Sequence, residues 1–393
     1  MNESNKKDIQ KKPIKKNSSA KKNGKKKNSW KIHFPVSSMF LKKYSSMGKL
    51  MRRAILLIIA IIFIFSILLM NYSFSPIERI NKTVVFDIPS GASFLESTEI
   101  LNKAGLIKNR LFFYSLTIIK RATKHLCAGE YEINTMMTPW TMINKLMRGE
   151  IKQYRVLIPE DLSMREIADR LSSQKLINKE IFFELARDEN FLQSLDIKAE
   201  SIEGYLFPDT YNFNRTMNTR RIMKKMVDRF REKVTPAMIQ RANDLGLSTH
   251  EFITLASIIG KESGDDAEKP FISAVFHNRL RKKIRLQSDP TAVYDMESFD
   301  GKVLRSYLRR KSPYNTYVVK GLPPGPIANP GVTSLKATLN PAPVDYLYFV
   351  SKNDGTHFFS SSLVEHNKAV NKYVFNKNQQ KQQLEYKSPD KKD

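Results

Sequence analysis

Residues 248–263 read STHEFITLASIIGKES, and this segment has the marks of a helix. Ser248 and Glu251 stand in the S-x-x-E spacing of a capping box, in which both side chains satisfy backbone N–H groups at a helix start. Apolar residues then recur at spacings of three and four, at Phe252, Leu255 and Ile259. The next position of that face is Glu262, where the pattern favours a core residue. A carboxyl at such a place is a candidate catalytic group.

Two physical effects predict a raised pKa for Glu262. Burial disfavours the charged carboxylate, and the last turn of a helix lies at the negative end of the helix dipole. A carboxyl that holds its proton near neutral pH is what a general acid needs. The alternative is a structural glutamate that pairs with a nearby cation such as Lys261 or Arg279.

The net charge of +27 is concentrated at the start of the chain. Residues 1–53 hold 17 Lys and Arg against two acidic residues, so this tail carries +15 of the total. Its first 35 or so residues cannot form a core, and we expect them to be disordered. We interpret the tail as a cytoplasmic segment that fixes topology and attracts anionic lipids, in preference to one that binds nucleic acid.

An uncharged apolar run follows, from Ala54 to Met70. Its length suits a membrane-spanning helix, and aromatic residues extend the predicted span to 54–74. Five Lys and Arg occupy the 20 residues before the run and two occupy the 20 after it. The positive-inside rule therefore predicts a single-pass protein of the cell (inner) membrane, with a cytoplasmic N-terminus and the remainder on the extracytoplasmic side.

Two stretches of the exported part repeat each other at an offset of 70 residues. Ile88-Pro89 precedes Phe112-Phe113, as Ile158-Pro159 precedes Phe182-Phe183. Each copy predicts a strand, a turn and two helices, and these units resemble the LysM carbohydrate-binding module; the alternative is an α+β spacer. The one cysteine, Cys127, excludes an intrachain disulfide and is predicted to be a small core residue.

Downstream of the repeats the pattern predicts a mixed α+β domain. Asp265 and Asp266 are expected to cap a helix that runs through Lys282, and Asp345–Ser351 is typical of a strand. The layout is therefore α+β throughout, with five parts: a basic tail (1–53), a membrane helix (54–74), a repeated LysM-like region (80–198), a catalytic domain (199–376) and a polar C-terminal tail (377–393).

Several other chemistries lack their motifs. The histidines show no H-E-x-x-H or comparable ligand spacing, and no G-x-S-x-G elbow or Walker-type loop is present. We therefore expect neither a metal nor a cofactor.

A set of motifs then points to one family. The segment Ala256–Glu262 is followed by VFHNRL (275–280), LQSDPT (286–291), YNTY (314–317) and GLPPGPI (321–327). Further matches stand upstream and downstream, at Glu203-Gly204, Phe207–Thr210, Asn329–Gly331 and Tyr346–Val350. Together they resemble the membrane-bound endolytic murein transglycosylases, the MltG/YceG-like family.

The resemblance implies a lyase that acts on nascent peptidoglycan, with Glu262 as its acid/base. Many members carry a second Glu where this chain has Gly260, so only Glu262 is left for the role; we expect the glycine to allow close approach of a glycan. The implied reaction cleaves the bond between N-acetylmuramic acid and N-acetylglucosamine with formation of a 1,6-anhydro product.

Further expectations concern substrate and partners. Gln287, Asp289, Tyr314, Asn315 and Tyr317 are predicted glycan contacts, each with loop packing as the alternative. A hydrolase would need a second carboxylate, for which Asp265, Asp266 and Asp289 are the candidates. A non-catalytic wall-binding protein is the other alternative. The resemblance also implies association with peptidoglycan synthases.

Overall fold

The computed structural model describes residues 48–375, so most of the expected basic tail and the whole polar C-terminal tail lie outside the described residues. The chain divides into two compact units, the first ending at Leu68 and the second beginning at Leu69. Helix α2 (Lys49–Phe74) has a mean hydropathy of 3.0 over its most apolar window. Among the described residues it is the one helix long and apolar enough to cross a membrane. This agrees with the predicted span.

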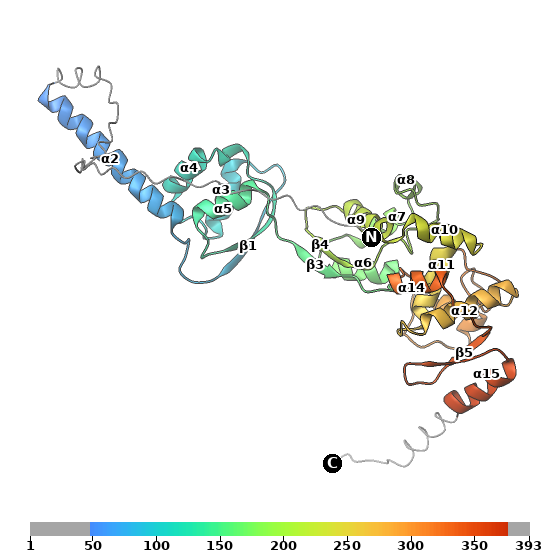
Figure 1. The fold of residues 1–393 in the computed structure, drawn as a ribbon. Helices are drawn as coiled ribbons and strands as arrows, with labels where there is room; N and C mark the ends of the chain where they lie inside the picture. The colour runs from blue at the N-terminus through green and yellow to red at the C-terminus, as the bar shows by residue number, and fades with distance from the viewer. Residues whose placement is uncertain (1–47, 376–393) are drawn as a thin grey trace, which may run out of the picture. The chain divides into compact units, whose positions relative to one another are not determined.

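In the part of the second unit that the structure describes, the chain forms short helices and six strands. Figure 1 draws them as a ribbon. The strands are β1 (Thr83–Ile88), β2 (Gly129–Asn134), β3 (Tyr154–Leu157), β4 (Thr210–Phe213), β5 (Tyr348–Ser351) and β6 (His357–Ser360). The α-helices up to the central one are α3 (Phe94–Lys103), α4 (Arg110–Ile119), α5 (Pro139–Met147), α6 (Met164–Ser173), α7 (Lys179–Leu185), α8 (Glu189–Ser194), α9 (Thr219–Lys233), α10 (Pro236–Asp244) and α11 (Thr249–Glu262). Those after it are α12 (Lys269–Arg281), α13 (Asp289–Val293), α14 (Val332–Leu339) and α15 (Leu363–Val370).

Single turns of 3₁₀ or π-helix complete the fold at 122–124, 307–309 and 371–375. The predicted mixture of helices and strands is confirmed.

The strands form three antiparallel pairs, β1 with β2, β3 with β4 and β5 with β6. Along the chain, α3 and α4 lie between β1 and β2, and α6, α7 and α8 lie between β3 and β4. Each repeat therefore has the order strand, helices, strand. In both, the first helix starts with a capping box, at Ser93 and at Ser163. The repetition of sequence corresponds to a repetition of structure.

The second repeat packs into the same core as the residues that follow it. Strand β3 pairs with β4 from Tyr154↔Phe213 to Leu157↔Thr210. One cluster of buried apolar residues runs from Val156 to Leu339. The expected boundary between 198 and 199 lies within this packing unit, because β3 and β4 stand on opposite sides of it.

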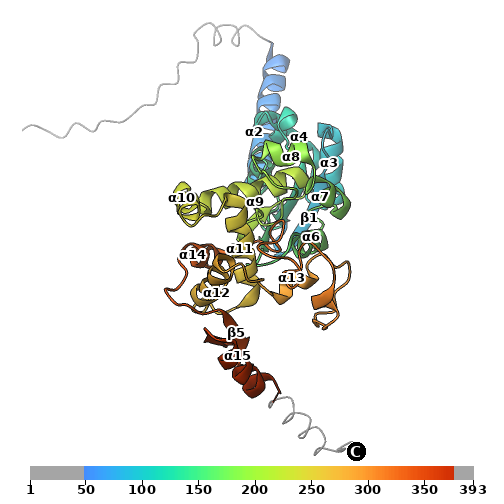
Figure 2. The ribbon, with the colours of Figure 1, turned by 90° about the vertical axis from the view of Figure 1, so that its right-hand side faces the viewer.

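Helix α11 is the central element of the larger core. Its capping box is confirmed, since Ser248 N–H donates to Glu251 Oε2 at 2.9 Å and Glu251 N–H donates to Ser248 Oγ at 3.2 Å. Every residue from Phe252 to Gly260 is buried, so the helix is enclosed on all sides and not on one face. It contacts α10, α12, α13 and α14 (Figures 1 and 2).

Two predictions of detail are wrong. Helix α12 begins at Lys269 with Glu268 at its N-cap and no side-chain cap, whereas Asp265 and Asp266 were expected to start it. Asp265 instead closes a turn, where its carboxylate accepts from Ala267 N at 2.9 Å. Cys127 is exposed and not a core residue.

Candidate active site

Glu262 is the last residue of α11 and lines a pocket of about 420 Å³. We call this the Glu262 pocket; its other walls are Arg279, Leu286, Gln287, Asp289, Tyr317, Phe349, Val350, Ser351, His357 and His366. The Glu262 side chain is partly exposed, so a ligand in the pocket can contact its carboxyl. Helix α11, the loop before α13 and the β5–β6 hairpin together position the site.

The surroundings of Glu262 favour its protonated form. Burial is the largest cause and raises the pKa of Glu262 to about 7, and the negative charge of Asp289 acts in the same direction. A hydrogen bond from Ser288 and the charge of Arg279 lower this pKa, but by less. The predicted direction of the shift is thus confirmed, with burial as its main cause.

The structural alternative for Glu262 requires a paired cation. Within residues 48–375 the carboxyl of Glu262 makes no ion pair. Lys261 lies 3.5 Å from Glu166 instead. The buried Arg279 donates to backbone carbonyls, from Nε to Leu347 at 2.7 Å and from Nη1 to Leu286 at 2.7 Å. Arg279 therefore links two backbone segments beside the pocket. In the part of the chain that the structure describes, Glu262 has no cation in ion-pair contact, which does not fit the structural alternative.

A network of hydroxyl groups fixes the loop beside Glu262. Ser288 Oγ donates a short hydrogen bond to Glu262 Oε1, and Ser288 N–H donates to Thr316 Oγ1 at 2.9 Å. Thr291 Oγ1 lies 2.7 Å from Thr316 Oγ1. Gln287 has a φ of 51°, in the left-handed region that costs a non-glycine residue energy. The network holds this conformation and directs Ser288 at the carboxyl.

Three predicted glycan contacts lie in the Glu262 pocket: Gln287, Asp289 and Tyr317. The Tyr317 hydroxyl donates to Asp289 Oδ1 at 2.5 Å. Burial and this bond to Asp289 raise the pKa of Tyr317 well above its ordinary value, so the phenol stays protonated. Of the three carboxylates considered for a hydrolase, Asp289 lines the pocket, whereas Asp265 and Asp266 do not.

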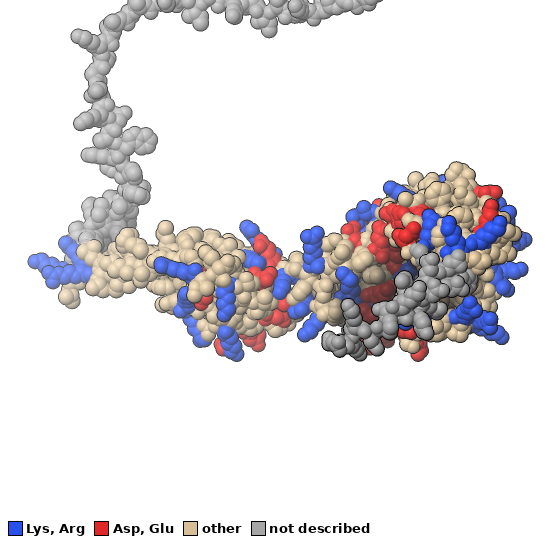
Figure 3. Space-filling model, turned by 90° about the horizontal axis from the view of Figure 1, so that it is seen from below, with Lys and Arg blue, Asp and Glu red and all other residues tan. Residues whose placement is uncertain are grey.

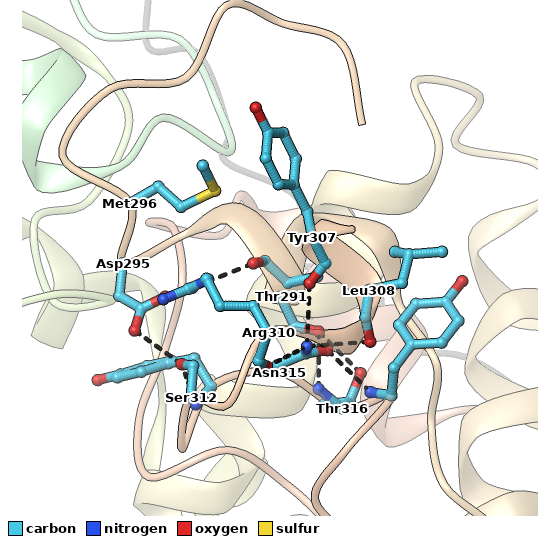
Figure 4. A network of polar contacts seen from close by, with 12 residues as sticks. Thr291, Asp295, Met296, Tyr307, Leu308, Arg310, Ser312, Asn315 and Thr316 are labelled. Atoms are coloured by element: carbon cyan, nitrogen blue, oxygen red, sulfur yellow. Dashed lines mark hydrogen bonds and ion pairs between the residues drawn. The ribbon is translucent and has the colours of Figure 1, made fainter. Parts of the chain in front are cut away.

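The other two predicted contacts lie elsewhere. Asn315 is fully buried, and its amide donates to the carbonyls of residues 307, 308 and 310, the last at 2.8 Å (Figure 4). Its position fits loop packing. Tyr314 lines a neighbouring pocket of about 550 Å³ and packs on Tyr294, with ring centroids 4.8 Å apart.

Gly260 does not line the Glu262 pocket. A Cβ at this position would overlap the carboxylate of Asp161, which comes from the turn after β3. The close approach that the glycine permits is therefore made by the protein's own Asp161, and the expectation of a glycan there is wrong. This contact ties the second repeat to the helix that carries Glu262.

The roles of three residues are not predicted by the sequence. Ser288 stands in the motif of residues 286–291 without a predicted role, and Arg279 was expected only as a possible cation partner of Glu262. Glu203 is fully buried and accepts hydrogen bonds from Met164 N, Tyr294 OH and Asn329 Nδ2 at 2.8 to 3.0 Å. It lies in a turn, where no periodicity marks a buried position; the motif Glu203-Gly204 was the available signal.

Comparisons with known proteins agree with these motifs. The model of the YceG-like family matches residues 86–372. The endolytic murein transglycosylase of Bacillus subtilis is 35% identical over 321 residues, which cover 77% of this chain and 89% of that protein. The protein of the same name from Streptococcus pneumoniae is 28% identical over 340 residues, which cover 78% of this chain and 61% of that protein.

A crystal structure of a YceG-like protein from Listeria monocytogenes is similar in fold, with a TM-score of 0.51 and 32% sequence identity. The match covers 74% of this chain and 99% of that one. The family match spans most of the chain, and both the Bacillus relative and the Listeria structure exceed 30% identity over about three quarters of it. This chain belongs to the YceG-like family.

Proposed function

We propose that the protein is an endolytic peptidoglycan lytic transglycosylase that cleaves nascent glycan strands between N-acetylmuramic acid and N-acetylglucosamine. The observation that carries this proposal is Glu262, a carboxyl with a pKa near 7 at the wall of an accessible pocket. The relatives named endolytic murein transglycosylases support the same substrate. Such cleavage shortens or terminates strands.

The chemistry needs one carboxyl. Protonated Glu262 donates its proton to the glycosidic oxygen as the bond from that oxygen to C1 of the muramic residue breaks. The resulting carboxylate then takes the proton of the C6 hydroxyl while the C6 oxygen bonds to C1. The ring-closed product is 1,6-anhydro-N-acetylmuramic acid, and Glu262 is protonated again. A pKa near the working pH suits a group that must both give and accept a proton.

Ser288 and Asp289 support Glu262 in different ways. The hydroxyl of Ser288 orients the carboxyl through its hydrogen bond, and the charge of Asp289 favours the protonated form. We propose Gln287, Asp289 and Tyr317 as contacts of the sugar at the cleaved bond, since all three line the Glu262 pocket.

Hydrolysis is the second candidate chemistry. Asp289 lies in the same pocket as Glu262, and a carboxylate that activates water would leave reducing ends in place of anhydro ends. A non-catalytic anchor that only binds the wall is the remaining alternative. Mass spectrometry of products from uncrosslinked glycan strands separates the three, because anhydro ends, reducing ends and uncut strands differ in mass.

We also propose a membrane topology for the chain. Helix α2 anchors the protein in the cell membrane, with the basic N-terminus in the cytoplasm near anionic lipids. The catalytic domain, whose core also includes the second repeat, lies outside. We propose LysM-like modules for the region 80–198, which the strand–helix–helix–strand order of residues 83–134 supports. Peptidoglycan synthases are proposed partners. A protease added to sealed cells should cleave the exported part and spare the tail.

A further inference from the structure

A second pocket lies beside the active site and has no role in the chemistry above. Its volume is about 550 Å³, within the range of small-ligand sites, and its walls include Arg187, Glu200, Tyr294 and Tyr314. A linking pocket of about 560 Å³ shares Ser163, Arg165 and Tyr294 with the second pocket. The linking pocket also shares Asp289 with the Glu262 pocket. Three adjoining pockets thus extend from Glu262 to Arg187.

The aromatic wall of the second pocket is held rigidly. Tyr294 donates through its hydroxyl to the buried Glu203 at 2.9 Å, and its ring packs on Tyr314. Ser312 links the segments that carry the two tyrosines. Its Oγ donates to the carboxylate of Asp295, the residue after Tyr294, at 2.7 Å and accepts from Tyr314 N at 3.0 Å. Figure 4 shows the Asp295–Ser312 bond and the contacts of Asn315 in this network. A fixed, partly exposed aromatic ring is suited to stack on a sugar, because little entropy is lost on binding.

The charged wall of the second pocket is open to a ligand. Arg187 follows the end of α7 and is exposed. No carboxylate of residues 48–375 lies within ion-pair distance of its guanidinium, whereas the nearby Arg310 pairs with Asp295. Figure 3 shows basic and acidic side chains together on the face of the described chain that it draws. Arg187 is available for an anionic group.

We propose that the second pocket binds a disaccharide–peptide unit of the same glycan strand, away from the bond that is cleaved. Tyr314 stacks on a sugar ring, and Arg187 pairs with a carboxylate of the peptide that the muramic residue carries. This inference rests on the proposed function, since it takes peptidoglycan as the substrate. It explains how an enzyme could select the interior of a strand: a unit in the second pocket places a bond several sugars from the end over Glu262.

Binding to a catalytically silent protein tests the inference independently of cleavage. The full chain with Glu262→Gln, in detergent, is titrated with uncrosslinked strands that carry their peptides and with the same strands after the peptides are removed by an amidase. Addition of Arg187→Gln should weaken binding of peptide-bearing strands about tenfold, which is the effect expected of one charge-assisted hydrogen bond. Binding of peptide-free strands should be the same with and without Arg187→Gln.

Two control variants define the outcome. Arg187→Lys keeps the charge and should restore part of the affinity, and Arg170→Gln removes an exposed arginine that lines none of the three pockets. Equal affinities with and without Arg187→Gln, or an equal loss on both strands, would overturn the assignment to the peptide. If the wild type cleaves no strand, the proposed function fails. The binding comparison still shows whether Arg187 in the second pocket binds the peptide.

Discussion

The hydroxyl of Ser288 donates a hydrogen bond to Glu262 across the gap between the end of α11 and the start of α13. This bond stabilises the carboxylate, whereas burial and the charge of Asp289 stabilise the protonated form. The balance leaves the pKa of Glu262 at about 7, so both forms are populated near neutral pH. A group that first gives and then takes a proton needs such a balance.

Replacement of Ser288 by alanine should move the pH profile upward. Since the lost hydrogen bond lowers the pKa of Glu262, its loss raises that pKa, and the alkaline limb of kcat/KM shifts from about pH 7 to higher pH. Loss of orientation should also lower kcat/KM at pH 6 roughly tenfold, as about 1.4 kcal/mol implies. The matched control is Ser334→Ala, a buried serine on α14 outside the pocket. An unchanged limb would contradict the role of Ser288.

Replacement of Asp289 by asparagine should move the profile the other way. Its negative charge raises the pKa of Glu262, so Asp289→Asn lowers that pKa and shifts the alkaline limb to lower pH. The products should keep their anhydro ends, because Asp289 takes no proton in the proposed reaction. Asp266→Asn is the control, since Asp266 pairs with Lys269 at 2.8 Å outside the pocket. If wild-type products carry reducing ends and Asp289→Asn abolishes their formation, the enzyme is a hydrolase.

Replacement of Gly260 by alanine should destabilise the protein, although alanine favours a helix more than glycine does. Helix propensity alone predicts a gain of about 1 kcal/mol, but the new Cβ would overlap the carboxylate of Asp161. Overpacking of this kind costs about 1–3 kcal/mol, so the measured free energy of unfolding should fall. Asp161 has a φ of 62°, which glycine adopts freely, and Asp161→Gly in the Gly260→Ala background should restore stability. A Gly260→Ala variant as stable as the wild type would show that the contact is loose.

Glu203 should make stability depend on pH. Burial raises the pKa of Glu203 to about 7 from an ordinary 4.5, so the folded state binds its proton more tightly than the unfolded state. The contribution is therefore present in full below pH 4.5 and is lost as pH rises to 7, by about 3 kcal/mol at most. Glu203→Gln should remove this part of the pH dependence in thermal unfolding, while the exposed control Glu200→Gln should not. Parallel curves for Glu203→Gln and wild type would contradict the buried protonated carboxyl.

Sequence patterns predicted the parts of the fold that local physics controls. The capping box at Ser248 and Glu251 placed the start of α11 correctly, and the apolar run predicted α2. The same patterns failed at Asp265 and Asp266. Residues of this type also stabilise turns, and here Asp265 closes a turn before the helix, which begins only at Lys269. The periodic face of α11 also understated its burial, since its other sides are covered by further helices, among them α14 (Val332–Leu339), which lies far along the chain.

The candidate site was predicted only as far as its chemistry is local. Glu262 could be found from one helix, because a carboxyl interrupted an apolar face. The hydrogen bonds of Ser288 and Arg279 could not be predicted, since they depend on how the loop before α13 folds back on α11. Tyr314 and Asn315 share one motif with Tyr317, yet successive side chains of a loop point in different directions, and only Tyr317 reaches the Glu262 pocket.

The most direct test is product analysis with wild type and Glu262→Gln side by side. Both full-length proteins are incubated at pH 6 with uncrosslinked nascent glycan, and the strand ends are identified by mass spectrometry. We expect 1,6-anhydro ends from the wild type and none from Glu262→Gln, which keeps the shape of the side chain and removes its acid. Equal amounts of anhydro ends from both proteins would contradict the assignment of Glu262 as the acid/base.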